Sequence, residues 1–166
     1  ANLTGTLPAI DGSNLTGIST THPAWFGRHD QSTGQGIPTD TWTGIANLGN
    51  DSVSTTGWNS TTGIFTVPSG KAGVYYAFGA VAIDDIQSDD VIKCGISKNG
   101  DSSPGAYGET RAQYSESNGV YQAQHAQVFN LAVGDTLQLY AYHNEGSTEP
   151  LEQWLCQFGG FRIFAS

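Results

Sequence analysis

Apolar and polar residues alternate in short runs through most of the chain, and no window carries a sustained helical stripe. The runs are rich in β-branched and aromatic residues, and Gly, Asn, Asp and Ser separate them, which is typical of strands joined by turns. The pattern predicts two sheets and almost no helix. The predicted strands lie near Ala24–Gly27, Thr41–Leu48, Ile64–Val67, Val74–Ile83, Val91–Ser97, Gly105–Gln113, Val120–Leu131, Thr136–His143 and Leu155–Phe164.

Two of these strands are apolar on both faces, although a monomeric sandwich needs only one buried face. Along Val74–Ile83 neither alternate set of residues is polar, and along Thr136–His143 tyrosines alternate with leucines and an alanine. We therefore expect one face to form the core and the other a subunit contact, with a face covered by the chain's own loops as the alternative. The residues expected at the contact are Tyr76, Phe78, Tyr140, Tyr142 and Phe161.

The composition fits a single β-rich domain, because the chain has 166 residues, 22 of them glycine, and only 13% are charged. A net charge of −9, from 15 acidic and 6 basic residues, argues against binding to nucleic acid, whose phosphates require clustered Lys and Arg. No apolar run is long enough to span a bilayer, so membrane insertion is not expected.

Five short motifs follow one another in the domain. They are Phe-Thr-Val-Pro at 65–68, Ala-Gly-Val-Tyr-Tyr-Ala-Phe at 72–78, Lys-Asn-Gly at 98–100, Leu-Ala-Val-Gly-Asp at 131–135 and Phe-Gly-Gly-Phe at 158–161. In these motifs the segment 23–166 resembles the C1q and tumour-necrosis-factor family of trimeric jelly rolls. The resemblance implies an all-β, C1q/TNF-like sandwich of two antiparallel sheets that assembles as a homotrimer, so that the expected contact is a trimer interface.

Residues 1–22 form a separate N-terminal arm, because Asn-Leu-Thr-Gly at 2–5 recurs at 14–17. Its apolar residues are spaced irregularly among Gly, Pro, Asp and Ser, which favours an extended arm that docks on a partner; a disordered tail is the alternative. The stretch 7–17 looks like segments of structural proteins of tailed bacteriophages. The residues expected to contact the partner are Leu3, Leu7, Ile10, Leu15 and Ile18.

No group of residues suggests catalysis, and we expect neither an enzyme nor a cofactor. The four histidines are scattered, and no Ser or Cys lies in the glycine-flanked turn of a nucleophile. Cys94 and Cys156 have no metal-binding spacing, so two buried thiols are the favoured interpretation and a disulfide is the alternative.

Four aspartates crowd between two predicted strands, and their oxygens could hold a hard cation. The spacing fits no known calcium loop, so we favour a solvated acidic turn and keep a metal site as a weak alternative. The four residues are Asp84, Asp85, Asp89 and Asp90.

Several aromatic residues lie in or near loops rich in Asn and Gln, where they could stack on sugar rings. The same residues could equally fill the core and the subunit contact. They are Trp25, Trp58, Tyr107, Tyr114 and Trp154.

Together these patterns predict a non-enzymatic bacteriophage structural protein, a trimer at the virion surface. The favoured role is a capsid decoration or cement protein whose arm binds the major capsid protein or another virion protein, because a complete chain of this length leaves no room for a fibre shaft. The alternative is the C-terminal head of a tail fibre or receptor-binding protein that contacts a host glycan. An extracellular, secreted C1q-like binding protein is the third hypothesis.

Overall fold

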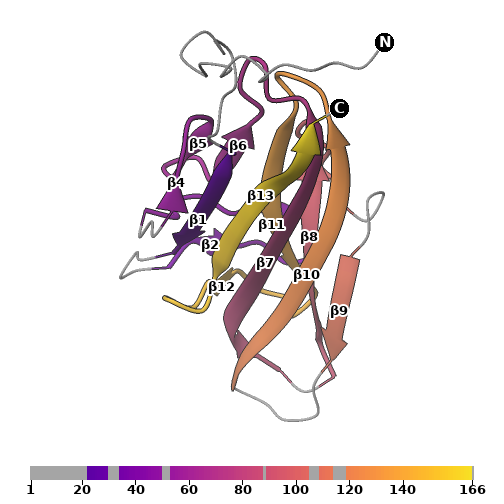
Figure 1. Cartoon of the computed structure of the whole chain (residues 1–166). Helices are drawn as coiled ribbons and strands as arrows, with labels where there is room; N and C mark the ends of the chain where they lie inside the picture. Colours follow the sequence, from indigo (N-terminus) through magenta and orange to yellow (C-terminus); the bar gives the residue numbers. More distant parts are fainter. Residues whose placement is uncertain are drawn as a thin grey trace, which may run out of the picture.

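The computed structural model describes residues 22–29, 34–49, 53–87, 89–104, 109–113 and 119–165. Within these ranges every regular element is a strand, and the two main sheets lie face to face (Figure 1). None of the described residues forms a helix long and apolar enough to cross a membrane. The expected arm residues Leu3, Leu7, Ile10, Leu15 and Ile18 lie outside the described residues.

The five-stranded sheet is built around one long central strand, β7 (Gly73–Ile86), which pairs antiparallel with β10 on one side and β13 on the other. Beyond β13 lie β1 and β4. The strands in spatial order are β10 (Gly119–Leu131), β7, β13 (Gln157–Ala165), β1 (Ala24–Arg28) and β4 (Val53–Ser54).

The six-stranded sheet has β11 (Thr136–His143) at its centre, between β6 and β8, and β11 also pairs with the short strand β3. Its members in spatial order are β5 (Trp58–Asn59), β6 (Ile64–Thr66), β11, β8 (Val91–Lys98) and β9 (Glu109–Gln113), with β3 (Thr43–Gly44) beside β11. A separate ribbon joins β2 (Gly36–Ile37) to β12 (Glu149–Pro150).

The core lies between the two sheets and follows the period of two along each strand. On β7 the residues Tyr75 and Val81 are fully buried, and on β11 the residues Leu137, Leu139 and Ala141 are fully buried. Trp25 and Phe65 stack in this layer with ring centroids 3.9 Å apart. The opposite side chains of β11 and of the first half of β7, through Phe78, therefore point away from the core, whereas Ala80 and Ala82 are buried as well.

Gly160 makes room for the largest core residue. A Cβ on Gly160 would lie 2.5 Å from Cη2 of Trp25, which is closer than real Cβ atoms approach a neighbour. The second glycine of the Phe-Gly-Gly-Phe motif is therefore required for Trp25 to lie flat against β13.

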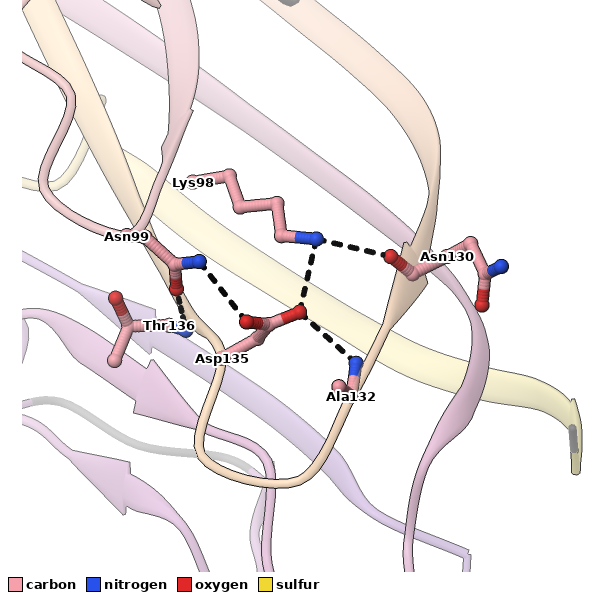
Figure 2. A network of polar contacts seen from close by, with 6 residues as sticks. All are labelled: Lys98, Asn99, Asn130, Ala132, Asp135 and Thr136. Carbon is pink, nitrogen blue, oxygen red and sulfur yellow. Dashed lines mark hydrogen bonds and ion pairs between the residues drawn. The ribbon is translucent and has the colours of Figure 1, made fainter.

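Two of the predicted turn motifs meet at one end of the sandwich (Figure 2). Lys98 forms an ion pair of 2.8 Å with Asp135 and donates to the backbone oxygen of Asn130. Asn99 donates to Asp135 and accepts from the amide of Thr136. The hydrogen bond from Lys98, helped by Asn99 and the amide of Ala132, lowers the pKa of Asp135 to about 2.

The predicted strands are found, with one correction. The strand expected over Thr41–Leu48 shortens to β3, because only Thr43 and Gly44 pair with β11. Asn47 then takes a left-handed conformation with φ 55°, which turns the chain toward residues 60 and 61. Four further strands of two residues each, β2, β4, β5 and β12, are too short to show a period.

Candidate self-association surface

The outward face of the five-stranded sheet carries two cross-strand rows of apolar residues, which we call the apolar face. The register places Phe26 beside Gly159 and Phe78 beside Gly159, and in the next row it places Phe161 beside Tyr76. The first row contains Val53, Phe26, Gly159, Phe78 and Ala126, and the second contains Ala24, Phe161, Tyr76 and Val128.

Aromatic rings occupy the middle of the apolar face. Tyr76 lies between Phe78 and Phe161, with ring centroids 6.0 and 5.7 Å away, and Phe26 lies 6.2 Å from Phe78. The outer members remain in solvent, since Val128 is 54% and Phe161 45% exposed. The rings thus bury part of one another, and the remaining apolar surface has no cover within the described chain.

Gly159 brings two of these rings together. A Cβ at this position would lie 2.8 Å from Cζ of Phe78 and 2.9 Å from Cδ2 of Phe26. Because glycine has no side chain, the rings approach each other across β13. The two glycines of the motif therefore make room on opposite sides of the sheet. Gly159 makes room for rings on the outward face, and Gly160 makes room for Trp25 in the core.

A polar row borders the apolar face. Arg28 lies opposite Gln157, and Ala80 lies opposite both Gln157 and Gln124. Between this row and the rings is a shallow hollow of about 330 Å³, lined in part by Tyr76, Ala80 and the two glutamines. The face thus combines an apolar centre with a polar border, as subunit contacts do.

The edge strand β10 borders the same face. It is outermost in its sheet and spans 13 residues without a Pro, Lys, Arg, Asp or Glu. Natural edge strands are usually protected by charge, proline or a bulge, because free backbone groups invite pairing with another chain. Here the described strand has one irregularity, between Gly119 and Tyr121. An edge with so little protection fits a position inside an assembly.

The five residues predicted for the trimer contact divide between the two sheets. Tyr76, Phe78 and Phe161 lie together on the apolar face. Tyr140 and Tyr142 belong to β11, in the other sheet, and alternate there with buried Leu139 and Ala141, so they point out on the opposite side of the sandwich. One flat contact cannot include all five residues.

The remaining predicted chemistry does not assemble into a site. Asp84 and Asp85 lie inside β7, not between the strands as expected, at the irregularity in its pairing with β10, and Asp85 has a left-handed φ of 57°. Asp89 (φ 71°) and Asp90 lie between β7 and β8. Over the described ranges, no three His, Cys, Asp or Glu side chains are grouped to hold a metal ion.

Both thiols are buried and free, which agrees with the favoured interpretation. Cys156 donates to the backbone oxygen of Ala82, and Cys94 lies 3.8 Å from the backbone oxygen of Gly79. Burial raises the pKa of Cys156 to about 12 and that of Cys94 still further, so neither is poised as a nucleophile.

Two members of the aromatic group that could stack on sugars or fill the core belong to the core. Trp25 is a core residue, and Trp58 packs against the core beside Phe158. Trp154 is half exposed and has φ 62°, whereas Tyr107 and Tyr114 lie outside the described residues. Trp25 and Trp58 face inward from β1 and β5, so the alternative of core residues holds for these two.

Comparison with known proteins shows a likeness in fold. No protein-family model and no curated protein matches the chain. Among solved structures, the globular domain of zebrafish complement 1qA protein has a TM-score of 0.59 and 16% identity, over 87% of this chain and 99% of that one. Eiger TNF from S. frugiperda gives 0.61 and 16%, over 87% and 94%. Murine APRIL gives 0.57 and 14%, over 86% and 100%.

The fold is the C1q/TNF-like jelly roll. The prediction made from the five motifs is therefore confirmed for the architecture. At identities of 14–16% the likeness establishes the fold alone, and the role of the domain has to be argued from its surfaces.

Proposed function

We propose that this domain is a non-enzymatic binding and structural module that assembles as a homotrimer through the apolar face. The observation that carries the proposal is the pair of apolar rows across five strands, with Val128, Phe161 and Val53 each about half exposed. Fully burying one such side chain contributes roughly 1.5–3 kcal/mol, so several of them together favour association. Soluble monomers seldom leave a large contiguous apolar patch in water.

A three-fold arrangement is favoured over other assemblies by two arguments. The resemblance to the C1q and tumour-necrosis-factor family points to three copies. The apolar face and the edge of β10 adjoin each other, so one copy can offer its edge to the face of the next, and such a head-to-tail contact forms a ring when its rotation closes, as a three-fold one does.

Native mass by light scattering tests the proposal. We expect a particle near three times 17.5 kDa at micromolar and at nanomolar protein. A compact assembly should persist on dilution because obligate interfaces resemble a domain core. A monomer at both concentrations would contradict the assembly and leave an isolated jelly roll.

On a particle, we propose that the trimer decorates and stabilises a bacteriophage capsid, with residues 1–22 bound to the major capsid protein or another virion protein. The sequence of residues 7–17, which looks like segments of tailed-phage structural proteins, supports this role. Bound trimers would stabilise the shell by mass action. Deleting residues 1–21 should abolish binding to empty capsids while the trimer persists; unchanged binding would contradict the role of the arm.

A second role, the head of a fibre or receptor-binding protein, is favoured by one observation. The outward face of the six-stranded sheet carries Trp42, Tyr140 and Tyr142 together with charged residues. A capsid cement protein needs no such surface. A fibre head lacking residues 1–21 should keep its binding to host cells, which separates the two roles.

A further inference from the structure

The outward side of the six-stranded sheet, which we call the mixed face, presents three aromatic side chains. Tyr140 and Tyr142 lie two positions apart on β11, and the residues that alternate with them are fully buried. Trp42 directly precedes β3, and its ring centroid lies 5.5 Å from that of Tyr142 at an interplanar angle of 45°. The three rings therefore come from one strand, β11, and from the residue that precedes the neighbouring strand β3.

Charged groups of both signs hold these rings in place. The Lys93 ammonium lies 4.9 Å from the centroid of Tyr142 and 3.1 Å from Oε1 of Glu109. Tyr142 donates a hydrogen bond of 2.8 Å to Oδ1 of Asp40, and this bond raises the pKa of Tyr142. Asp40 itself has φ 54° and is anchored by a hydrogen bond from its amide to the backbone oxygen of His143.

Glycines flank Tyr140 on both neighbouring strands. In its cross-strand row Tyr140 has Gly95 on one side and Gly44 on the other, and Glu109 follows Gly95 on β9. Gly95 is buried, and the Gln138 side chain lies against Gly44, so neither glycine leaves a hollow. The row thus contains an aromatic ring and an acceptor group, separated by one residue without a side chain.

We propose that the mixed face binds the pyranose rings of a neutral oligosaccharide. Aromatic faces stack on the C–H surface of a sugar, while the carboxylates accept hydrogen bonds from hydroxyl groups and the ammonium donates to them. Asp40, Asp101 and Glu109 lie near these rings together with Lys93 and Arg111, which are register neighbours on β8 and β9, so sugar hydroxyl groups would meet both acceptors and donors. The binding residues are Trp42, Tyr140, Tyr142, Asp40, Lys93 and Glu109.

Sugar binding is a property separate from self-association. One mixed face could bind a sugar whether or not the chain forms a trimer. Because the apolar face lies on the other sheet, three mixed faces would stay open in a trimer. Three linked sites raise the avidity for a surface coated with the sugar by about 10²-fold or more without a new contact. The two proposals therefore fail separately, one in the mass of the particle and the other in its binding of soluble sugar.

The test uses the full chain and soluble tetrasaccharides. Cellotetraose, maltotetraose, chitotetraose and mannotetraose are titrated by isothermal calorimetry, and a broad printed array of neutral glycans is probed in parallel. We expect at least one neutral glycan to bind and Tyr140→Ala to weaken it about three- to tenfold, as the energy of one ring contact implies. Trp42→Phe should keep most of the binding, and Trp42→Ala should lose it.

Two controls keep the outcome clear. Thermal unfolding of each mixed-face variant must match the parent chain, and Trp42→Phe serves if Trp42→Ala unfolds. Val128→Asp on the apolar face should leave the affinity for the soluble tetrasaccharide unchanged while it reduces retention on the coated surface. The proposal is overturned if no neutral glycan binds the parent chain, or if Tyr140→Ala and Trp42→Ala bind it as well as the parent chain does.

Discussion

The two outward faces of this sandwich follow the same alternation of side chains and differ in what the alternation presents. On the apolar face, neighbouring strands contribute Phe26, Phe78, Tyr76 and Phe161, and the two central rows contain no charged residue. On the mixed face, aromatic rings lie beside charged groups: Lys93 forms an ion pair with Glu109, and Asp40 accepts a hydrogen bond from Tyr142.

The difference indicates what each face is suited to contact. A row of apolar side chains loses little on complete desolvation, so it suits a protein surface of the same kind. Paired charges would lose their hydration on complete burial, and they suit a small ligand that offers hydroxyl groups in exchange. The apolar face is therefore suited to a permanent protein contact, and the mixed face is suited to reversible binding of a hydrated ligand.

The largest effect is expected from a charge in the apolar face. Val128→Asp would place a carboxylate with no partner on the β10 side of the apolar face, inside the proposed contact, at a cost of several kcal/mol per copy. We expect the trimer to dissociate at micromolar concentration, a change of at least about 10³-fold in the association constant. Sedimentation velocity measures it.

Val133→Asp is the matched control for this substitution. Val133 is 52% exposed, as Val128 is 54%, but it lies in the turn between β10 and β11 and outside the two apolar rows. The control variant should remain trimeric. Equal dissociation of both variants would show that exposed valines in general, and not the apolar face, govern assembly.

The second-largest effect is expected from alanine substitutions at the two glycines of β13, which face opposite sides of the sheet. Gly160→Ala forces a Cβ against Trp25 in the core, and overpacking of this kind costs about 1–3 kcal/mol. Gly159→Ala forces a Cβ against Phe26 and Phe78, which are at the surface and can shift. We expect Gly160→Ala to lower the melting temperature by about 3–10 °C, measured at one protein concentration.

Gly159→Ala should instead weaken assembly about tenfold with a smaller change in melting temperature. Dilution followed by light scattering measures the first quantity, and calorimetry measures the second. If the two substitutions had equal effects on both, the assignment of Gly159 to the interface and Gly160 to the core would be wrong.

The alternation of the strands and the order of the motifs were enough to predict the jelly roll. These patterns also placed Tyr76, Phe78 and Phe161 on an outward face. Tyr76 and Phe78 share one strand period, and Phe161 pairs directly with Tyr76. The patterns did not separate Tyr140 and Tyr142 from this group. A period of two fixes which residues of a strand share a face, but the sheet to which β11 belongs depends on its pairing with β6 and β8, far away in the chain.

The composition of the mixed face could not be predicted for the same reason. The surface of the mixed face depends on Trp42, Lys93 and Glu109, which come from three separate segments and have no common motif. Lys93 and Tyr142 become neighbours only through the register of β8 and β11. The sequence contains the aromatic residues, but nothing local indicates that these rather than Trp25 or Trp58 reach the surface.

A smaller effect is expected at the end of the sandwich, away from both faces. The pKa of Asp135 is about 2 in the folded chain and 3.8 in the reference state, so the folded state favours the carboxylate. Its contribution to stability is present above about pH 4 and is lost as pH falls from about 4 to about 2. With partial exposure to solvent, the contribution is on the order of 1–2 kcal/mol.

Asp135→Asn should therefore lower the free energy of unfolding by on the order of 1–2 kcal/mol at pH 7 and by much less at pH 2. Urea unfolding at the two pH values measures the difference. The variant should keep its native mass and its binding of sugar, because Asp135 lies on neither face. A pH-independent loss would mean that the contacts of the side chain, and not its charge, stabilise the turn.

The smallest effect is expected from Tyr142→Phe, which removes the hydroxyl and keeps the ring. The hydrogen bond to Asp40 is solvent-exposed, so its loss should cost no more than about 0.5–1.5 kcal/mol in stability. Sugar binding should weaken by about threefold or less, because the stacking surface survives while Asp40 loses the donor that fixes it. Titration of the tetrasaccharide that binds the parent chain measures this. A loss as large as that of Tyr140→Ala would assign the recognition to the hydroxyl group, and the mixed face would then act by hydrogen bonding more than by stacking.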